Sequence, residues 1–117
     1  MATVGNQSEL GLAWGVHRAP KDAPTKVLRQ IESEAQALAV SIAAGNHKLA
    51  YIAACVGKSI AYVSRLQSGK RPIPDRLITP LCAATGSNLL RQFVDLQHAL
   101  EGQSEVDRLA ALLREAA

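Results

Sequence analysis

Aromatic side chains are scarce in this chain: they make up 3% of its 117 residues, although hydrophobic residues make up 48%. A core of this composition must be filled by Ala, Leu, Ile and Val. The sequence also lacks the sustained apolar–polar alternation that marks a half-buried strand. Ala, Leu, Arg, Glu and Gln, which favour helices, dominate instead. We therefore expect an all-α domain, long enough to bury a core of its own.

Cysteine and histidine are few and scattered. Cys55 and Cys82 each lie in an apolar run and are interpreted as reduced thiols inside the core. The three histidines have no zinc-type spacing with these cysteines. The sequence also shows no paired carboxylates, no nucleophile–base set and no cofactor motif. We therefore predict no metal site, no cofactor and no enzymatic activity.

Targeting signals are also missing. The first twenty residues lack the basic head and apolar core of a signal peptide. The most hydrophobic region, residues 37–57, is interrupted by the polar and turn-forming stretch 45–48, so it cannot form a single membrane span. The prediction is a soluble, cytoplasmic protein.

Positive charge is concentrated in the middle of the chain. Residues 1–45 are neutral overall, residues 46–86 carry a net charge of +5, and residues 87–117 carry −2. A local excess of Lys and Arg is the electrostatic pattern expected of a surface that contacts phosphates.

The pattern of breakers predicts a flexible N-terminal arm over 1–23, a compact domain of five to six helices over 24–101, and a C-terminal amphipathic helix over 102–117 as a possible oligomerisation element. Residues from Thr25 to Ala44 are expected to form one helix, ended by Gly45 or Asn46. The further predicted helices are 47–56, 59–67, 75–86 (with Pro80 inside it), 88–102 and 104–116.

The stretch GKS at residues 57–59 admits two interpretations. A phosphate-binding loop requires a glycine five residues before Gly57 and a buried strand before that. Ile52 occupies that position, within a segment of helical character, so this interpretation fails.

A helix-turn-helix makes different demands, and the sequence meets them together. A small residue, Ala53, lies on the inner face of the first helix, and Gly57 follows four residues later, where the turn needs positive φ. Val63 and Leu66, six and nine residues after this glycine, supply the apolar inner face of the second helix.

These residues resemble a known family. The stretch IAACVGKSIAYVSRLQSGKR, residues 52–71, is similar to the lambda-repressor/Cro-type (XRE-like) helix-turn-helix of phage and bacterial regulators. The closely similar part spans about 25 residues, and a looser likeness extends to residue 101. The run from Leu77 to Leu100 bears a weaker likeness to phage regulators of the CII kind. The resemblance implies a transcriptional regulator of phage or mobile-element origin.

In this family the second motif helix lies in the DNA major groove, which implies a set of DNA-contacting residues here. The residues so predicted are Lys48, Lys58, Ser59, Ile60, Ala61, Tyr62, Ser64, Arg65, Lys70 and Arg71. Three of them depart from the family pattern: Lys58 replaces an aliphatic residue, and Ile60 and Ala61 replace polar base readers. Arg65 has two alternative predicted roles, a contact to guanine or a contact to phosphate. Tyr62 also has two, a phosphate contact or a packing role.

The predicted partner is double-stranded DNA, bound by a homodimer or a higher oligomer of the chain. Segment 87–117 is the candidate surface for self-association or for a protein partner. Two alternatives remain at this point: the antitoxin of a toxin–antitoxin pair that represses its own promoter, and a helical adaptor that binds proteins and not DNA.

Overall fold

The computed structural model describes residues 19–116, which form six helices with a single isolated bridge between Lys21 and Ser87 and no strand. The all-α prediction is therefore confirmed. The helices are α1 (Thr25–Leu28), α2 (Glu34–Ala44), α3 (Leu49–Val56), α4 (Ile60–Ser68), α5 (Asp75–Thr85) and α6 (Leu89–Ala116).

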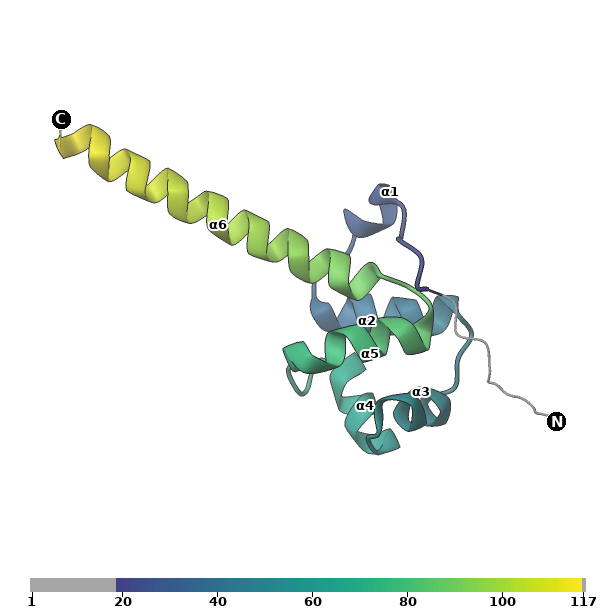
Figure 1. Ribbon diagram of the computed structural model, residues 1–117. Helices are drawn as coiled ribbons and strands as arrows, with labels where there is room; N and C mark the ends of the chain where they lie inside the picture. The colour runs from purple at the N-terminus through teal and green to yellow at the C-terminus, as the bar shows by residue number, and fades with distance from the viewer. Residues whose placement is uncertain (1–18, 117) are drawn as a thin grey trace.

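Helices α2 to α5 and the first two turns of α6 enclose one hydrophobic core (Figure 1). Helix α2 packs on α4 and α6, α3 packs on α4 and α5, and α5 packs on α6. Leu38, Leu81 and Leu90, from three different helices, are almost completely buried in this core. As the composition requires, Phe93 is the one aromatic residue among the buried core side chains of the described part.

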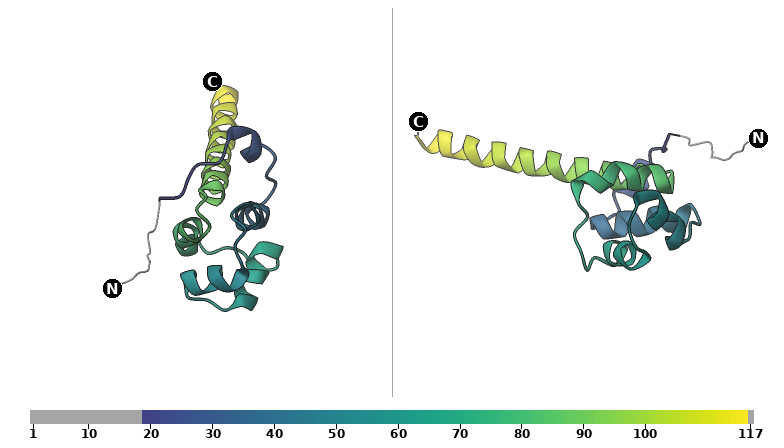
Figure 2. Two further views of the ribbon diagram at one scale, coloured as in Figure 1. Left: turned by 90° about the vertical axis from the view of Figure 1, so that its right-hand side faces the viewer. Right: turned by 60° about the horizontal axis from the view of Figure 1, so that its bottom comes forward.

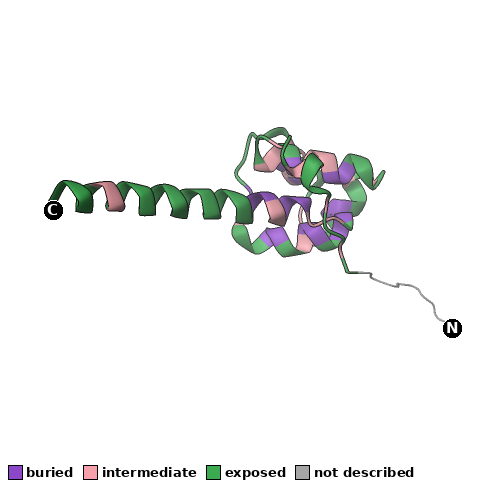
Figure 3. Ribbon diagram, turned by 90° about the horizontal axis from the view of Figure 1, so that it is seen from above, coloured by how far each residue is buried: buried purple, intermediate pink, exposed green. Residues whose placement is uncertain are grey.

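The motif helices α3 and α4 lie on the side of the core opposite α6, as both views of Figure 2 show. The far part of α6 leaves the core altogether, and the molecule measures 72 × 26 × 25 Å. Among the residues from Asp95 to Ala116 none is buried, and Figure 3 shows this part of the helix exposed except for a short half-buried stretch near its end.

The single helix expected from Thr25 to Ala44 is wrong, because the chain breaks between Leu28 and Glu34. Ser33 caps α2: its hydroxyl accepts a hydrogen bond from the Gln36 N–H at 3.1 Å. The Gln36 side chain in turn accepts one from the Glu32 N–H at 2.6 Å. These two hydrogen bonds fix the start of α2, and they outweigh the continuous apolar periodicity of the segment.

The expected break near Gly102 is also wrong, since α6 continues from Leu89 to Ala116. One glycine costs a helix about 1 kcal/mol, which the good helix formers around it offset. Ser104 does not start a new helix, and Asp107 instead accepts a side-chain hydrogen bond from Gln103 one turn earlier, at 3.0 Å.

Of the predicted arm, residues 1–23, the first 18 residues lie outside the described part of the chain. The last residues of the arm lie against the start of α6, where the Lys21 carbonyl accepts a hydrogen bond from the Asn88 N–H at 2.8 Å. The Ala23 N–H donates to Oε1 of Gln92, also at 2.8 Å. Residues 21–23 are therefore anchored to the domain.

No single helix of the described chain has both the length and the apolar character needed to cross a membrane; α3 and α4 meet those criteria only when taken together as a pair bent by 105°.

Candidate nucleic-acid interface

Helices α3 and α4 are joined by a three-residue turn that changes the direction of the chain sharply. Gly57 ends α3 at φ 70°, and the Lys58 N–H donates to the Ala53 carbonyl at 3.0 Å, which closes the last turn. Ser59 then caps α4, its hydroxyl accepting from the Tyr62 N–H at 3.1 Å. The two helix axes differ by 105°, which is the geometry of a helix-turn-helix.

The inner side of this motif follows the predicted spacing. Val63 and Leu66 of α4 are fully buried, and Ile52 and Ala53 of α3 belong to the same core cluster. The short side chain of Ala53 leaves room for the two helices to pack closely, and the opposite face of α4 lies toward solvent.

The turn yields a direct test of the helix-turn-helix geometry. We expect Gly57→Ala to lower the free energy of unfolding by about 1–2 kcal/mol, because alanine at positive φ is strained. Gly102→Ala is a matched control, since a Cβ at either glycine meets no atom within 4 Å. There the change is expected to stabilise the helix by up to about 1 kcal/mol. Urea unfolding measures the free energy of unfolding of both variants. Equal changes in the two would mean that residue 57 does not need the left-handed conformation.

His47 fixes the start of α3, a role that the sequence did not indicate. Its Nε2 lies 3.0 Å from the Thr85 carbonyl oxygen at the end of α5. Its ring also stacks on Tyr51 in the first turn of α3, with ring centroids 5.5 Å apart. Because Thr85 is 38 residues away in the chain, no local sequence pattern predicts this contact.

Two rows of side chains lie on the solvent face of α4. Ala61 and Arg65, four residues apart, form one row and are both exposed. Ile60 and Ser64 form the row beside it, and Ile60 is 52% exposed. The first turn of this face is thus apolar, and the second turn is polar and positively charged.

Tyr62 brings together two cations that are distant in sequence. The Lys58 Nζ lies 5.3 Å from the centre of the Tyr62 ring, and the Arg71 guanidinium carbon lies 4.9 Å from it. Each such cation–π contact contributes about 0.5–1 kcal/mol at an exposed site. The half-buried ring therefore holds a pair of positive charges beside the face of α4.

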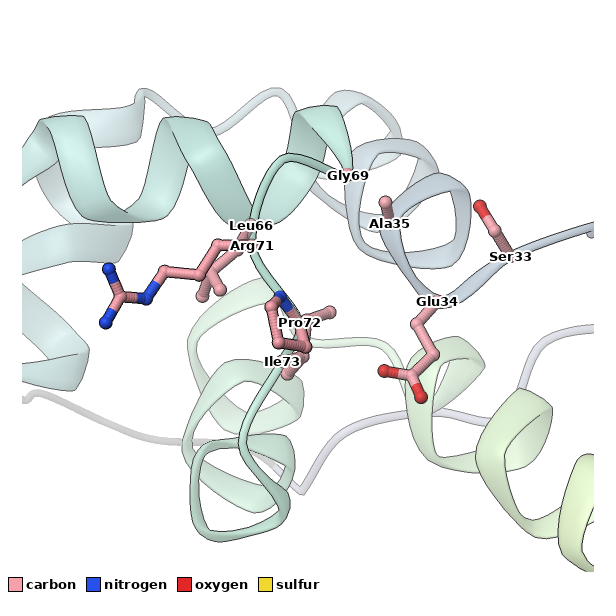
Figure 4. A pocket seen from close by; sticks show the side chains of 8 residues that line it. All are labelled: Ser33, Glu34, Ala35, Leu66, Gly69, Arg71, Pro72 and Ile73. Carbon is pink, nitrogen blue, oxygen red and sulfur yellow. The ribbon is translucent and has the colours of Figure 1, made fainter.

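Arg71 also lines a shallow cavity of about 220 Å³ between the start of α2 and the loop after α4. Figure 4 shows its guanidinium directed away from Ser33 and Glu34 on the other side of this cavity. Arg71 is thus oriented toward the α4 side of the molecule.

None of the positive charges around α4 forms an ion pair among the described residues, where the one ion pair joins Arg108 to Glu105 on α6. Arg65, Lys70 and Arg71 are exposed, and Lys70 follows α4 directly in the loop. Lys48 is exposed too, but it precedes α3 at the end away from the turn, so about 12 Å of helix separates it from Gly57. Ser59 acts as a helix cap, and its side chain is already engaged.

The two cysteines have different environments, so the prediction of two core thiols is half wrong. Cys82 is buried, and burial raises the pKa of its thiol, which keeps it protonated. Cys55 is exposed and lines a cavity of about 330 Å³ between α3 and α5. Its apolar sequence neighbours suggested a buried position, but Cys55 lies beside this cavity and not inside the core cluster.

Comparison of the chain with family profiles, curated proteins and solved structures finds no match.

Proposed function

We propose that the chain is a cytoplasmic, sequence-specific transcriptional regulator of the lambda-repressor/Cro type that binds double-stranded DNA. The observation that carries this proposal is a helix-turn-helix whose exposed second helix is flanked by positive charges that form no ion pair among the described residues. In such a complex α4 lies in the major groove with its N-terminal half toward the bases.

The polar residues around α4 then divide into two groups. Lys58, Lys70 and Arg71 contact the sugar–phosphate backbone, where they position the domain without reading sequence. Arg65, in the second turn of α4, faces the bases and can donate two hydrogen bonds to a guanine. Ser59 caps the Tyr62 N–H, so the N–H groups of Ile60 and Ala61 remain to add a phosphate contact.

One module of this size makes few base contacts, so the proposal includes a dimer joined through α6. Residues at alternating steps of three and four form an apolar stripe on the exposed part of this helix, the α6 seam. The seam consists of Ala99, Gly102, Val106, Leu109, Leu113 and Ala116. This is the heptad spacing with which helices pair in coiled coils, and all charged residues from 99 to 116 lie outside it. The proposed occupant is a second copy of the same seam.

DNA binding is tested by fluorescence anisotropy with a pool of random duplexes over a salt series, followed by sequencing of the bound fraction. We expect affinity to fall steeply with salt, because each phosphate contact releases a counterion. We expect Arg65→Ala/Arg71→Ala to weaken binding about tenfold or more and to reduce the salt slope by about 1.

Arg108→Ala/Arg114→Ala is the matched control, since it removes the same charge from α6 and is expected to bind like the native chain. Equal weakening of both variants would mean that net charge alone attracts the DNA. Absence of binding at low salt would contradict the proposal and favour the protein-binding adaptor.

A further inference from the structure

The first turn of α4 faces outward without a hydrogen-bonding side chain directed at the bases. Ile60, 52% exposed, and Ala61 occupy it, whereas Ser59 is engaged in capping and Tyr62 in holding two cations. An exposed isoleucine is ordinary on a protein surface. Here, however, it occupies the part of the motif that approaches the base edges most closely, next to Ala61.

The major groove offers such a surface one apolar group, the C5 methyl of thymine. We propose that Ile60 and Ala61 read thymine methyls, and that this contact, together with Arg65, sets the sequence preference of the chain. The inference rests on the proposed DNA binding and specifies its substrate.

The spacing along α4 adds a constraint on the DNA site. Ala61 and Arg65 lie four residues apart in the same row, a rise of roughly 6 Å. Successive base pairs are separated by roughly 3.4 Å. The apolar turn and the arginine therefore face base pairs that are one or two steps apart. The bound sequences should contain a thymine that either adjoins a guanine or is separated from it by one base pair.

Replacing thymine by deoxyuridine removes this methyl group and leaves the base pairing unchanged. In a duplex selected by the native chain, each thymine is replaced in turn and the affinity is measured. Loss of one buried methyl is expected to weaken binding roughly fourfold at one or two positions, and to have little effect at the others.

The protein side of the test uses Ile60→Ser/Ala61→Ser. In this variant the same deoxyuridine replacements are expected to have no effect, because the apolar partner of the methyl is gone. Leu100→Ser is the control: Leu100 has a similar exposure of 55% but lies on α6, so it should retain the native fourfold sensitivity. Thermal unfolding of each variant establishes that it is folded.

Each outcome points to one conclusion. A deoxyuridine penalty that disappears only in the α4 variant supports the inference. A penalty that persists in that variant would mean that the methyl acts through DNA shape, and would overturn the inference. Binding that is indifferent to every replacement would overturn it as well, and would leave the proposed regulator intact. Failure to bind any duplex would overturn the proposed function itself, and the inference with it.

Discussion

Leu66→Ala is expected to lower the free energy of unfolding by about 2–5 kcal/mol, because it leaves a cavity at a fully buried position. Domains of this size are stable by only about 5–15 kcal/mol, so the variant loses a large part of its stability. Leu66 packs α4 on the core, and so the same change frees the outward row of Ala61 and Arg65 from its fixed orientation. Urea unfolding followed by circular dichroism measures the loss.

Leu100→Ala is the matched control for this experiment. It removes the same atoms from a leucine that is 55% exposed on α6, and the change in unfolding free energy should stay within about 0.5 kcal/mol. If the Leu66 variant lost less than about 1 kcal/mol, α4 would not be held by the core in the way described.

Leu109→Asp is expected to abolish self-association of the chain. Leu109 is 51% exposed in the single chain and lies in the middle of the α6 seam. A dimer loses this apolar contact twice, and burial of each leucine is worth about 1.5–3 kcal/mol. The dimer dissociation constant should therefore rise about a hundredfold or more. Sedimentation equilibrium over a concentration series measures it, and DNA affinity should fall in parallel.

The control here is Leu100→Asp, which adds the same charge to the same helix on the side away from the seam. Its self-association should match that of the native chain. Dissociation by both variants alike would mean that the helix is destabilised generally. A native chain that stays monomeric at all concentrations would contradict pairing through the α6 seam.

Sequence predicted the motif better than it predicted the helix boundaries around it. The requirements of the helix-turn-helix are local: Gly57, Val63 and Leu66 act within ten residues of one another, and Gly57 has positive φ while Val63 and Leu66 are buried. The outward position of Ile60, Ala61 and Arg65 follows from the same helical spacing. Whether these residues contact DNA remains a prediction.

The predicted helix boundaries were wrong where one local signal competed with another. Side-chain contacts were missed where residues distant in the sequence determine them. Apolar periodicity favoured a single helix through Glu32, yet the side chains of Ser33 and Gln36 cap a new helix that starts at Glu34. Gly102 indicated a break that its helix-forming neighbours override. The approach of Lys58 and Arg71 to Tyr62, and of His47 to Thr85, depends on the tertiary fold, which a linear pattern does not encode.

The continuity of α6 has a geometric consequence. A helix advances about 1.5 Å and turns about 100° with each residue. Because no break lies between the core-packed residue Leu90 and Leu109 in the seam, the number of residues between them sets both the reach of the helix and the angular phase between its two ends. In the proposed dimer, one inserted residue would rotate the second copy about the helix axis, whereas seven would nearly restore its direction and move it about 10 Å outward. The helix thus acts as a spacer: the number of its residues determines both its length and the angular phase between its two ends.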